Sequence, residues 1–383
     1  MLRLTLSKES EEFRGRFREW LSQHQAPGYG NDASLETFVR VGREWQRSLA
    51  SGGWVGVHWP SEFGGRSLSL VEEAVIQEEL VRVQSPQLLG LFGLTMVGPV
   101  LIRHGTQTQK ARYLSKILDA SEIWCQGFSE PGAGSDLAAI KTRARAVDGG
   151  FLVSGQKVWT SFAHIADWCF VLCRTSDEEQ KHKGLSYLLL DMKSKGITVR
   201  PLKQISGDEE FNEVFFEDVF VPAENVVGQV GDGWKIAIST LMYERVVLTF
   251  ARQLQSEVAL RALIEKCQSR ADGEFKAQLA KEISRACAVR ALAYEHLLNY
   301  AGGKAPGPEG SLDKLFWSES FQSIAKLSLK ASGIDAARGE LDPQSGSEAH
   351  RYLYSRGRSI AAGTSEIQRN IIAERILGLP KQG

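Results

Sequence analysis

Two short segments of the chain combine hydroxyl, glycine and aromatic residues in patterns that could bind a ligand. In FSEPGAGSD (residues 128–136), a proline and two glycines predict a tight turn whose amides can approach a bound group, and Ser129 and Ser135 add hydroxyls. In SGQKVWTS (residues 154–161), Trp159 stands beside two hydroxyl residues in an expected strand. Taken alone, each segment is more typical of an ordinary turn or strand edge. The third glycine of a dinucleotide-binding fingerprint is also missing.

A third candidate lies near the C-terminus, in RGRSIAAGTSEIQRNIIAERILGLP (residues 356–380). Isoleucine and leucine recur at helical spacing in its second half, and Thr364 or Ser365 can cap the helix that this spacing predicts. The preceding loop, AAGT, carries Ala362 where a polar side chain would be usual before a glycine turn. Ala362 is therefore either an ordinary small residue or the position of a catalytic group that has been lost.

A carboxylate on an apolar helix face is the best candidate for acid–base chemistry. Glu244 lies in STLMYERVVLTF, and the residues three before, three after and four after it are Leu241, Val247 and Leu248. Burial on such a face disfavours the charged carboxylate and raises its pKa, as a general base requires. By itself, the residue also fits a surface glutamate or one paired with a neighbouring helix.

Composition excludes several classes of function. The 383 residues include 46 basic and 46 acidic ones, which leaves no net charge for binding nucleic acid or an anionic membrane. Five scattered cysteines, without a second pair or a histidine cluster, predict buried reduced thiols in a cytoplasmic protein and no metal site. The first residues have no signal-peptide core, and the most apolar window, residues 88–102, is too short to span a bilayer.

The pattern of apolar residues changes twice along the chain. The first part has helical periodicity with three apolar stripes, at residues 13–21, 35–49 and 71–81. From about residue 122 to 230, short β-branched and aromatic runs are divided by glycines, as in strands and hairpins, and long helical patterns follow. Because strands and helices are segregated, a doubly wound parallel sheet is not expected. We expect an α+β fold with three domains, comprising residues 1–120 (α-helical), 121–231 (β) and 232–383 (helical).

Together and in this order, the segments resemble the acyl-CoA dehydrogenase family over essentially the whole chain. The matching stretches are SEPGAGSD, GQKVWTS, FNEVFFEDVFVPAENVVG and GTSEIQRNIIAERILGLP. The resemblance implies an N-terminal all-α domain, a middle β-barrel-like domain and a C-terminal four-helix bundle that carries the catalytic base. It also implies an enzyme of lipid metabolism and β-oxidation, a flavoprotein oxidoreductase that uses FAD to convert an acyl-CoA to the trans-2-enoyl-CoA.

The resemblance assigns cofactor-binding roles to individual residues. In the family, residues that match Gln126, Phe128 and Ser129 hold the pyrimidine edge of the flavin. A tryptophan that matches Trp159 packs near the isoalloxazine, and a hydroxyl that matches Ser161 faces its N5 atom. Here serine replaces the more common threonine and keeps the hydroxyl. The further cofactor-binding positions that the resemblance implies are Thr160, Thr364 and Glu366.

The resemblance also implies where the catalytic base lies. Many members of the family take a glutamate from an EGT loop, but the loop of this chain reads AGT and has Ala362 at that position. A subset, which resembles the isovaleryl- and long-chain-type enzymes, takes its base from the helix that opens the bundle, next to an arginine. This chain has Glu244 beside Arg245 there, so we expect Glu244 to be the base. The N–H of Ala362 can still donate to the thioester carbonyl. The implied substrate-binding positions are Ser135, Tyr243, Arg245, Ala362 and Gly363.

Two cofactor-binding patterns of the family, R-x-x-F-G and Q-x-x-G-G, are missing. The corresponding stretches read IEKCQSRADGEFKAQLAKE and PQSGSEAHRYLYSR. In homotetramers these patterns reach the FAD of the neighbouring subunit. The chain resembles the branch of heteromeric α2β2 enzymes of sterol side-chain degradation, in which a paralogous subunit would supply them. A homo-oligomer that holds the FAD tail with other residues is the alternative.

The same resemblance implies a branched, long or steroid-type acyl-CoA as substrate and an electron-transfer flavoprotein as electron acceptor. Two other functions stay open at this point. One is a non-catalytic partner subunit of a heteromeric acyl-CoA dehydrogenase, and the other is an acyl-CoA oxidase-like flavoenzyme.

Overall fold

Helices with side-chain caps form the first third of the chain. The computed structural model describes residues 6–28, 34–267, 272–304, 307–337 and 347–381, and the side chains of residues 243–251, 335 and 337 lie outside the description. Ser34 caps its helix with its hydroxyl, and Ser69 and Thr106 each form a capping box. The helices are α1 (Lys8–Gln23), α2 (Leu35–Ser51), α3 (Leu70–Arg82), α4 (Gly98–His104) and α5 (Gln107–Leu118). A π-helical turn, Gly93–Val97, precedes α4.

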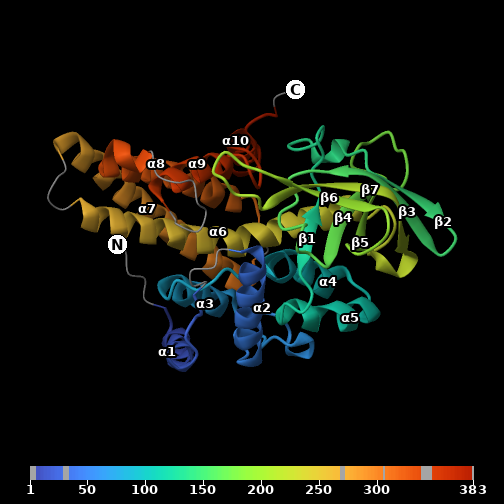
Figure 1. The fold of residues 1–383 in the computed structure, drawn as a ribbon, viewed down its shortest axis with the longest axis horizontal. Helices are drawn as coiled ribbons and strands as arrows, with labels where there is room; N and C mark the ends of the chain where they lie inside the picture. The colour runs from blue at the N-terminus through green and yellow to red at the C-terminus, as the bar shows by residue number, and fades with distance from the viewer. Residues whose placement is uncertain (1–5, 29–33, 268–271, 305–306, 338–346, 382–383) are drawn as a thin grey trace.

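A single twisted sheet follows, on the right in Figure 1. Its strands are β1 (Trp124–Gly127), β2 (Arg143–Val147), β3 (Gly150–Lys157), β4 (Trp168–Arg174), β5 (Leu185–Asp191), β6 (Ile197–Leu202), β7 (Phe211–Pro222) and β8 (Val226–Val227). The main path runs β6-β7-β3-β2-β4-β5-β8, and β1 pairs with β4. Only the pairs β1–β4 and β2–β4 are parallel among the described strands. The sheet is therefore mainly antiparallel, as the segregated pattern predicts.

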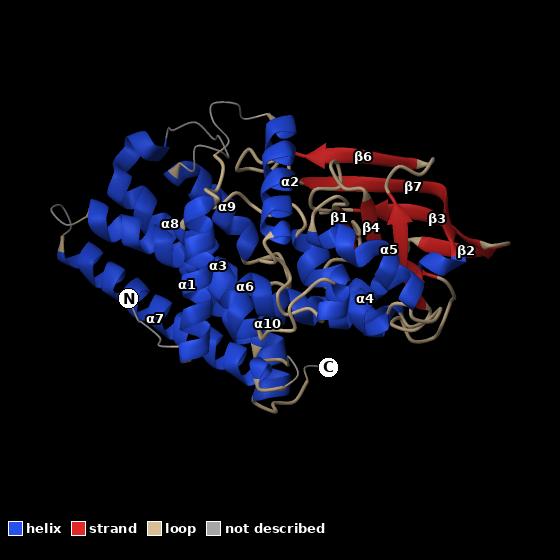
Figure 2. Cartoon of the chain, turned by 90° about the horizontal axis from the view of Figure 1, so that it is seen from below, coloured by secondary structure: helices blue, strands red, loops and turns tan. Residues whose placement is uncertain are grey.

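Five helices complete the described part of the chain, and most of them pack beside the first helical group (Figure 2). They are α6 (Gly233–Lys266), α7 (Gly273–Ala301), α8 (Gly310–Ala337), α9 (Glu348–Arg358) and α10 (Ser365–Ile371). Helix α6 runs from the bundle to the sheet, where it packs against β5 (Figure 1). The helix expected after Thr364 is present as α10, and it continues as a π-helical turn, Ile372–Ile376.

The sheet separates two apolar cores because side chains alternate along its strands. On β4, Phe170 faces a core shared with the N-terminal helices and the start of α6, whereas Cys169 and Cys173 face the other core. The shared core joins the helices to the sheet, which positions the segments discussed below.

The expectation of buried, reduced cysteines is met in part. All five cysteines are free; Cys125, Cys169 and Cys173 are buried, but Cys267 and Cys287 are only half-buried. Among the described residues, no group of three or more histidine, cysteine or acidic side chains could hold a metal ion. No helix within the described ranges is long and apolar enough to cross a membrane.

Candidate active site

The two glycine- and hydroxyl-containing segments lie side by side, although about twenty-five residues separate them. The amide of Val158 donates to the carbonyl of Ser129 at 2.9 Å. Lys157 donates through Nζ to the carbonyl of Phe128 at 3.0 Å and to Glu130 Oε1 at 2.9 Å. These bonds hold residues 126–130, after β1, against the end of β3.

The Lys157–Glu130 pair is buried and fully hydrogen-bonded. Lys157 is 0% exposed, and the carboxylate of Glu130 also accepts from the amides of Lys141 and Thr142 at 2.6 and 2.9 Å. Burial pushes the pKa of Glu130 upward, but the charge of Lys157 and these hydrogen bonds outweigh burial and leave the pKa below its ordinary value. Glu130 therefore stays ionised as a structural anchor. Sequence reasoning missed this pair, although a lysine directly before two apolar residues in GQKVW was a signal for it.

The segment after β3 has a strained backbone that the β6–β7 loop supports. Trp159 and Phe162 have φ of 60° and 59°, which side chains with a Cβ rarely adopt. Asn212 donates through Nδ2 to the carbonyl of Thr160 at 2.9 Å and accepts from its amide through its own carbonyl at 3.1 Å. The amide of Phe162 donates to the carbonyl of Glu210 at 2.7 Å. Thus residues 210–212 hold the shape of residues 159–162.

This region leaves polar atoms without partners and an aromatic side chain uncovered. Gln126 Nε2 and Thr160 Oγ1 are buried and find no hydrogen-bond partner among the described residues. Buried donors without partners are costly, so a bound group with acceptors is the natural partner for them. Trp159 is 58% exposed and has only an edge contact with Phe211, which leaves most of its indole free for stacking.

The loop between α9 and α10 also has a strained backbone. Ala362 and Gly363 have φ of 56° and 88°. Gln368 is fully buried, and its side-chain amide donates through Nε2 to the backbone carbonyls of Ala362 and Gly363, at 2.9 and 3.3 Å. The N–H of Ala362 has no acceptor among the described residues. Gln368 thus holds a loop that presents a free amide, and neither of these facts follows from the sequence pattern alone.

The remaining predicted site residues differ in exposure, and the side chains of some of them lie outside the described residues. Ser161 is half-buried, Ser135 is exposed, and Thr364 caps α10 by accepting from the amide of Ile367. The side chain of Glu366 is 79% exposed and lies 3.9 Å from Arg369. The backbone of α6 carries Tyr243, Glu244 and Arg245, but their side chains are outside the described residues, and so are those of Val247 and Leu248.

The two glycine- and hydroxyl-containing segments are thus brought together directly. The β6–β7 loop, which supports residues 159–162, also contacts helix α9, which leads into the α9–α10 loop. Arg358, the last residue of α9, contacts Glu210 at 3.4 Å between Nη2 and Oε1.

Comparison with known proteins identifies the family. The acyl-CoA dehydrogenase models match the chain in succession: the N-terminal domain at residues 7–121, the middle domain at 125–219 and the C-terminal domain at 231–377. The chain belongs to the acyl-CoA dehydrogenase family. The sequence-based expectation of this family and of its helical, β and helical parts is confirmed, and the chain is an enzyme of this class.

Two mycobacterial relatives support the same branch. The chain is 40% identical to acyl-CoA dehydrogenase IpdE1 of Mycobacterium tuberculosis over 98% of this chain and 99% of that protein. It is 39% identical to acyl-CoA dehydrogenase FadE34 of the same organism, over 88% of this chain and 46% of that protein.

Solved structures in the comparison include complexes of two different chains. The ChsE4–ChsE5 complex from Mycobacterium tuberculosis aligns with a TM-score of 0.85 and 26% identity, covering 100% of both chains. The Tcur3481–Tcur3483 steroid acyl-CoA dehydrogenase aligns with a TM-score of 0.86 and 25% identity, also over 100% of both.

Membership of this acyl-CoA dehydrogenase family implies a flavin cofactor, and the site fits one. Gln126 Nε2 and Thr160 Oγ1 are buried donors in need of acceptors, which the pyrimidine ring of a flavin offers. The exposed indole of Trp159 suits an aromatic ring system. Gln126, Thr160 and Trp159 are therefore the residues of this chain that would hold the flavin.

Proposed function

We propose that the protein uses FAD to dehydrogenate an acyl-CoA thioester between its α and β carbons, giving the trans-2-enoyl-CoA. The observation that carries the proposal is the succession of three family models over residues 7–377. The pairing of the two flavin-side segments and the free amide in the α9–α10 loop support it.

In this proposal each group of the chain has a separate task. Glu244 takes the proton from the α carbon, and the N–H of Ala362 donates to the thioester carbonyl as negative charge develops on its oxygen. Ser129 and Ser161 contribute to binding the cofactor, and Ser135, Tyr243 and Arg245 contribute to binding the substrate. The flavin, when bound, supplies the acceptor for the hydride that leaves the β carbon.

The proposed base lies on α6 and not in the α9–α10 loop, and this placement suggests the kind of acyl group. Alanine at position 362 leaves more room beside the α carbon than glutamate would, which favours a branched, long or steroid-type acyl chain. One structural relative is described as a steroid acyl-CoA dehydrogenase, which supports the steroid-type substrate.

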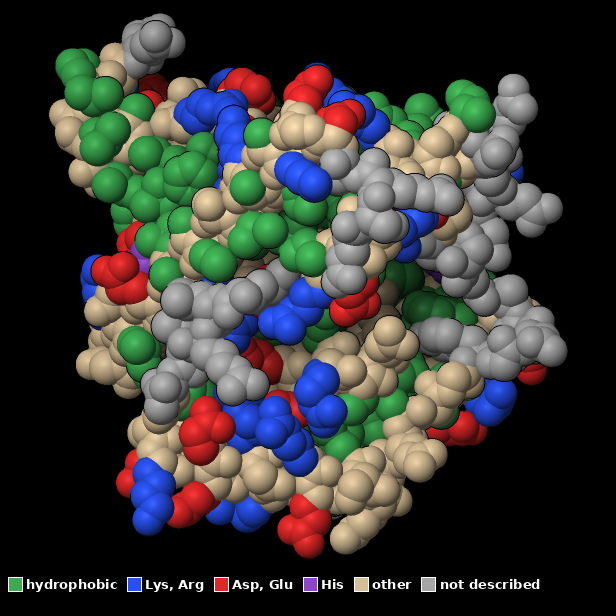
Figure 3. All heavy atoms as spheres, turned by 90° about the vertical axis from the view of Figure 1, so that its left-hand side faces the viewer, with side chains coloured by type: hydrophobic (Ala, Val, Ile, Leu, Met, Phe, Trp, Pro, Cys, Tyr) green, Lys and Arg blue, Asp and Glu red, His purple; other side chains and the backbone are tan. Residues whose placement is uncertain are grey.

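The oligomer in this proposal is an α2β2 heteromer with a paralogous subunit. The missing R-x-x-F-G and Q-x-x-G-G patterns and the two-chain relatives support it. The C-terminal helices, the α9–α10 loop and the segment after the last helical turn also carry large exposed side chains that suit burial in a subunit interface. These are Val258, Leu298, Phe316, Ile334, Ile360, Ile376, Leu377 and Leu379. Figure 3 shows hydrophobic side chains gathered over the upper left of the face at the bundle end, where charged side chains are fewer. An electron-transfer flavoprotein is the proposed acceptor, and a cytoplasmic location stays a prediction.

The variant Glu244→Gln tests the assignment of the base. The amide keeps the size of the side chain but cannot take a proton, so we expect kcat with an acyl-CoA to fall at least about a thousandfold. The matched control is Glu265→Gln, an exposed position on the same helix, which should keep wild-type kcat. Turnover of Glu244→Gln within about threefold of wild type would refute the assignment.

Expression alone and together with a paralogous acyl-CoA dehydrogenase chain tests the heteromer. We expect the chain alone to bind little FAD, and the co-expressed pair to purify as a yellow complex with one FAD per unlike pair. Activity on branched, long-chain and steroid CoA esters then ranks the substrates. If the chain alone is an active oligomer with one FAD per chain, the heteromer is wrong.

A further inference from the structure

A cluster of paired polar and charged side chains joins the β6–β7 loop (residues 203–210) to helix α9. Asp208 Oδ2 lies 2.9 Å from His350 Nε2, and Ser206 donates its hydroxyl to the same carboxylate at 2.5 Å. Glu210 lies 3.4 Å from Arg358, whose guanidinium also stacks 3.8 Å from the ring centre of Tyr354. In Figure 1 this loop extends from the sheet toward the C-terminal helices.

The paired side chains of this cluster are largely removed from water. Asp208 and His350 are 9% and 8% exposed, and the side chains of Glu210 and Arg358 are 20% and 14% exposed. Burial, aided by the neighbouring charge of Arg252, lowers the pKa of Arg358 to about 10. Burial likewise raises the pKa of Glu210, against the opposing effect of Arg358. Buried ion pairs of this kind add little net stability over apolar side chains, so their value lies in fixing a geometry.

One end of the cluster is attached to the flavin-side segment. The carbonyl of Glu210 accepts from the amide of Phe162 at 2.7 Å, and two residues later Asn212 holds both polar backbone groups of Thr160. A shift of Glu210 therefore moves the strained turn that carries Trp159.

The other end of the cluster is attached to the acyl loop, which we define as residues 359–364. Arg358 is the last residue of α9, and the carbonyl of the next residue, Ser359, accepts from the amide of Ser365 at 3.0 Å and from Lys314 Nζ at 3.2 Å. Only three residues separate Arg358 from Ala362. A shift of Arg358 therefore moves the free amide of Ala362.

We propose that Glu210 and Arg358 are positioning residues. Their contact holds residues 159–162 at a fixed distance from the acyl loop. Asp208 and His350 form a second contact between the same loop and α9. The proposal rests on the proposed function, because that function gives residues 159–162 their role toward the cofactor and the acyl loop its role toward the thioester. The reacting atoms must approach to about 3–3.5 Å, and a misplacement of about 1 Å can cost about a hundredfold in rate.

The first test measures the two segments without relying on turnover. Hydrogen–deuterium exchange is compared between the wild type, Glu210→Gln and Arg358→Lys, each as the full chain in the oligomer in which it purifies. We expect both variants to exchange faster in peptides that cover residues 159–162 and in peptides that cover residues 359–364. The control is Arg143→Gln, which breaks the exposed pair with Asp177 in the same sheet and should change neither peptide. Faster exchange in only one of the two segments, or in neither, would overturn the proposal.

The second test separates positioning from binding. With the acyl-CoA that the wild type turns over best, Glu210→Gln should lower kcat about tenfold or more and change KM less than about threefold. Arg358→Lys, which keeps the charge but not the planar fork, should lose less than Arg358→Gln. An unchanged kcat with a raised KM would overturn the proposal. If the wild type turns over no acyl-CoA either alone or co-expressed with a paralogous acyl-CoA dehydrogenase chain, the proposed function fails, and the exchange experiment still decides whether the two segments are coupled.

Discussion

Ala362 has a φ of 56°, in the left-handed region where a Cβ meets the backbone. Its neighbour Gly363 takes the same region without this cost, and Gln368 holds both carbonyls. The alanine therefore stores a small strain at the position where its amide is free. Strain of this kind persists only where surrounding bonds over-determine the backbone, and it is common at functional sites.

At this position a branched side chain should cost stability. We expect Ala362→Val to lower the free energy of unfolding by about 1–2 kcal/mol, because a β-branched residue tolerates a positive φ poorly. Ala362→Gly should stay within about 1 kcal/mol of wild type, since relief of strain offsets the greater freedom of the unfolded chain. Urea unfolding measures both, with Ala361→Val as the control at a residue without a positive φ. Equal losses at the two positions would contradict this account.

At the scale of elements, helices α7 and α8 are joined by a buried pair. His296 Nδ1 lies 2.8 Å from Asp313 Oδ2, and both side chains are less than a tenth exposed. Burial lowers the pKa of His296, but the hydrogen bond and charge of Asp313 outweigh it and raise the pKa above its ordinary value of 6.5. Burial raises the pKa of Asp313 as well. The folded chain therefore holds protons here more tightly than the unfolded chain.

This pair should make folding stability depend on pH in one direction. A raised histidine pKa contributes stability that is complete below about pH 6.5 and is lost as the pH rises through the folded value. We expect the free energy of unfolding of the wild type to fall between pH 6 and pH 8 more than that of His296→Gln, as measured by urea unfolding. His182→Gln, at an exposed histidine, is the control and should follow the wild type. Parallel curves for wild type and His296→Gln would refute the prediction.

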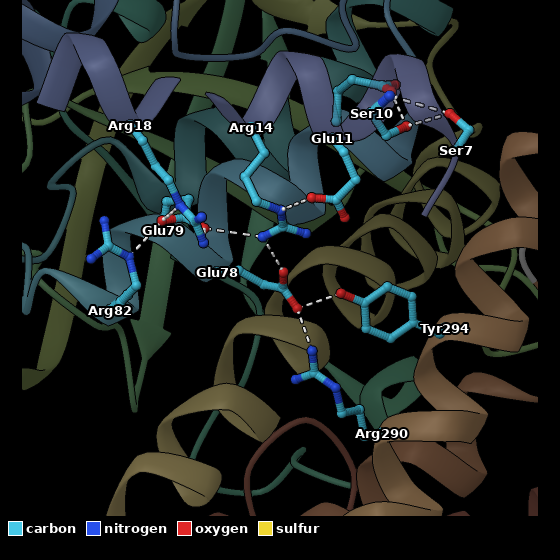
Figure 4. Close-up of polar contacts among 11 residues, drawn as sticks. Ser7, Ser10, Glu11, Arg14, Arg18, Glu78, Glu79, Arg82, Arg290 and Tyr294 are labelled. Carbon is cyan, nitrogen blue, oxygen red and sulfur yellow. Dashed lines mark hydrogen bonds and ion pairs between the residues drawn. The ribbon is translucent and has the colours of Figure 1, made fainter. Parts of the chain in front are cut away.

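At the scale of the whole molecule, one carboxylate ties the N-terminal helices to the C-terminal bundle. Glu78 on α3 pairs with Arg14 on α1 at 2.6 Å and with Arg290 on α7 at 2.8 Å, and it accepts from the hydroxyl of Tyr294 (Figure 4). Arg290 continues to Glu257 on α6 at 3.1 Å. The network thus connects four helices, and one of them is the helix that carries the predicted base.

Loss of the central carboxylate should destabilise the assembly of these helices. Because Arg14 and Arg290 would stay buried with less neutralising charge, we expect Glu78→Gln to lower the free energy of unfolding by about 3 kcal/mol. Glu44→Gln, in an exposed pair with Arg40, should cost less than about 0.5 kcal/mol. Urea unfolding of both variants at low and high salt measures this difference, and the effect of Glu78→Gln should persist in salt because the pair is buried. Similar losses for the two variants would contradict it.

Much of the fold was predictable because its signals are local. Helical apolar spacing indicates α1, α2 and α3, and short apolar runs rich in β-branched and aromatic residues indicate strands such as β4 and β5. The change from one pattern to the other indicates the order of helical, β and helical parts. The family motifs are also local, so they indicated the flavin-side segments and the acyl loop before any packing was known. The π-helical turn after Ile371 was not predicted, because helical spacing does not distinguish it from a regular turn.

The sequence by itself therefore determined the class of enzyme, the order of its parts and the segments that we propose face the cofactor. Only the tertiary structure decided which side chains hold those segments in place. Lys157 meets Glu130 across 27 positions, and Glu210 meets Arg358 across 148. Nothing in the local pattern of these residues selects their partners. The first pair depends on how the end of β3 lies against the segment after β1, and the second on how the β6–β7 loop packs against α9. Distance in the fold, not spacing in the chain, makes these charges parts of one site.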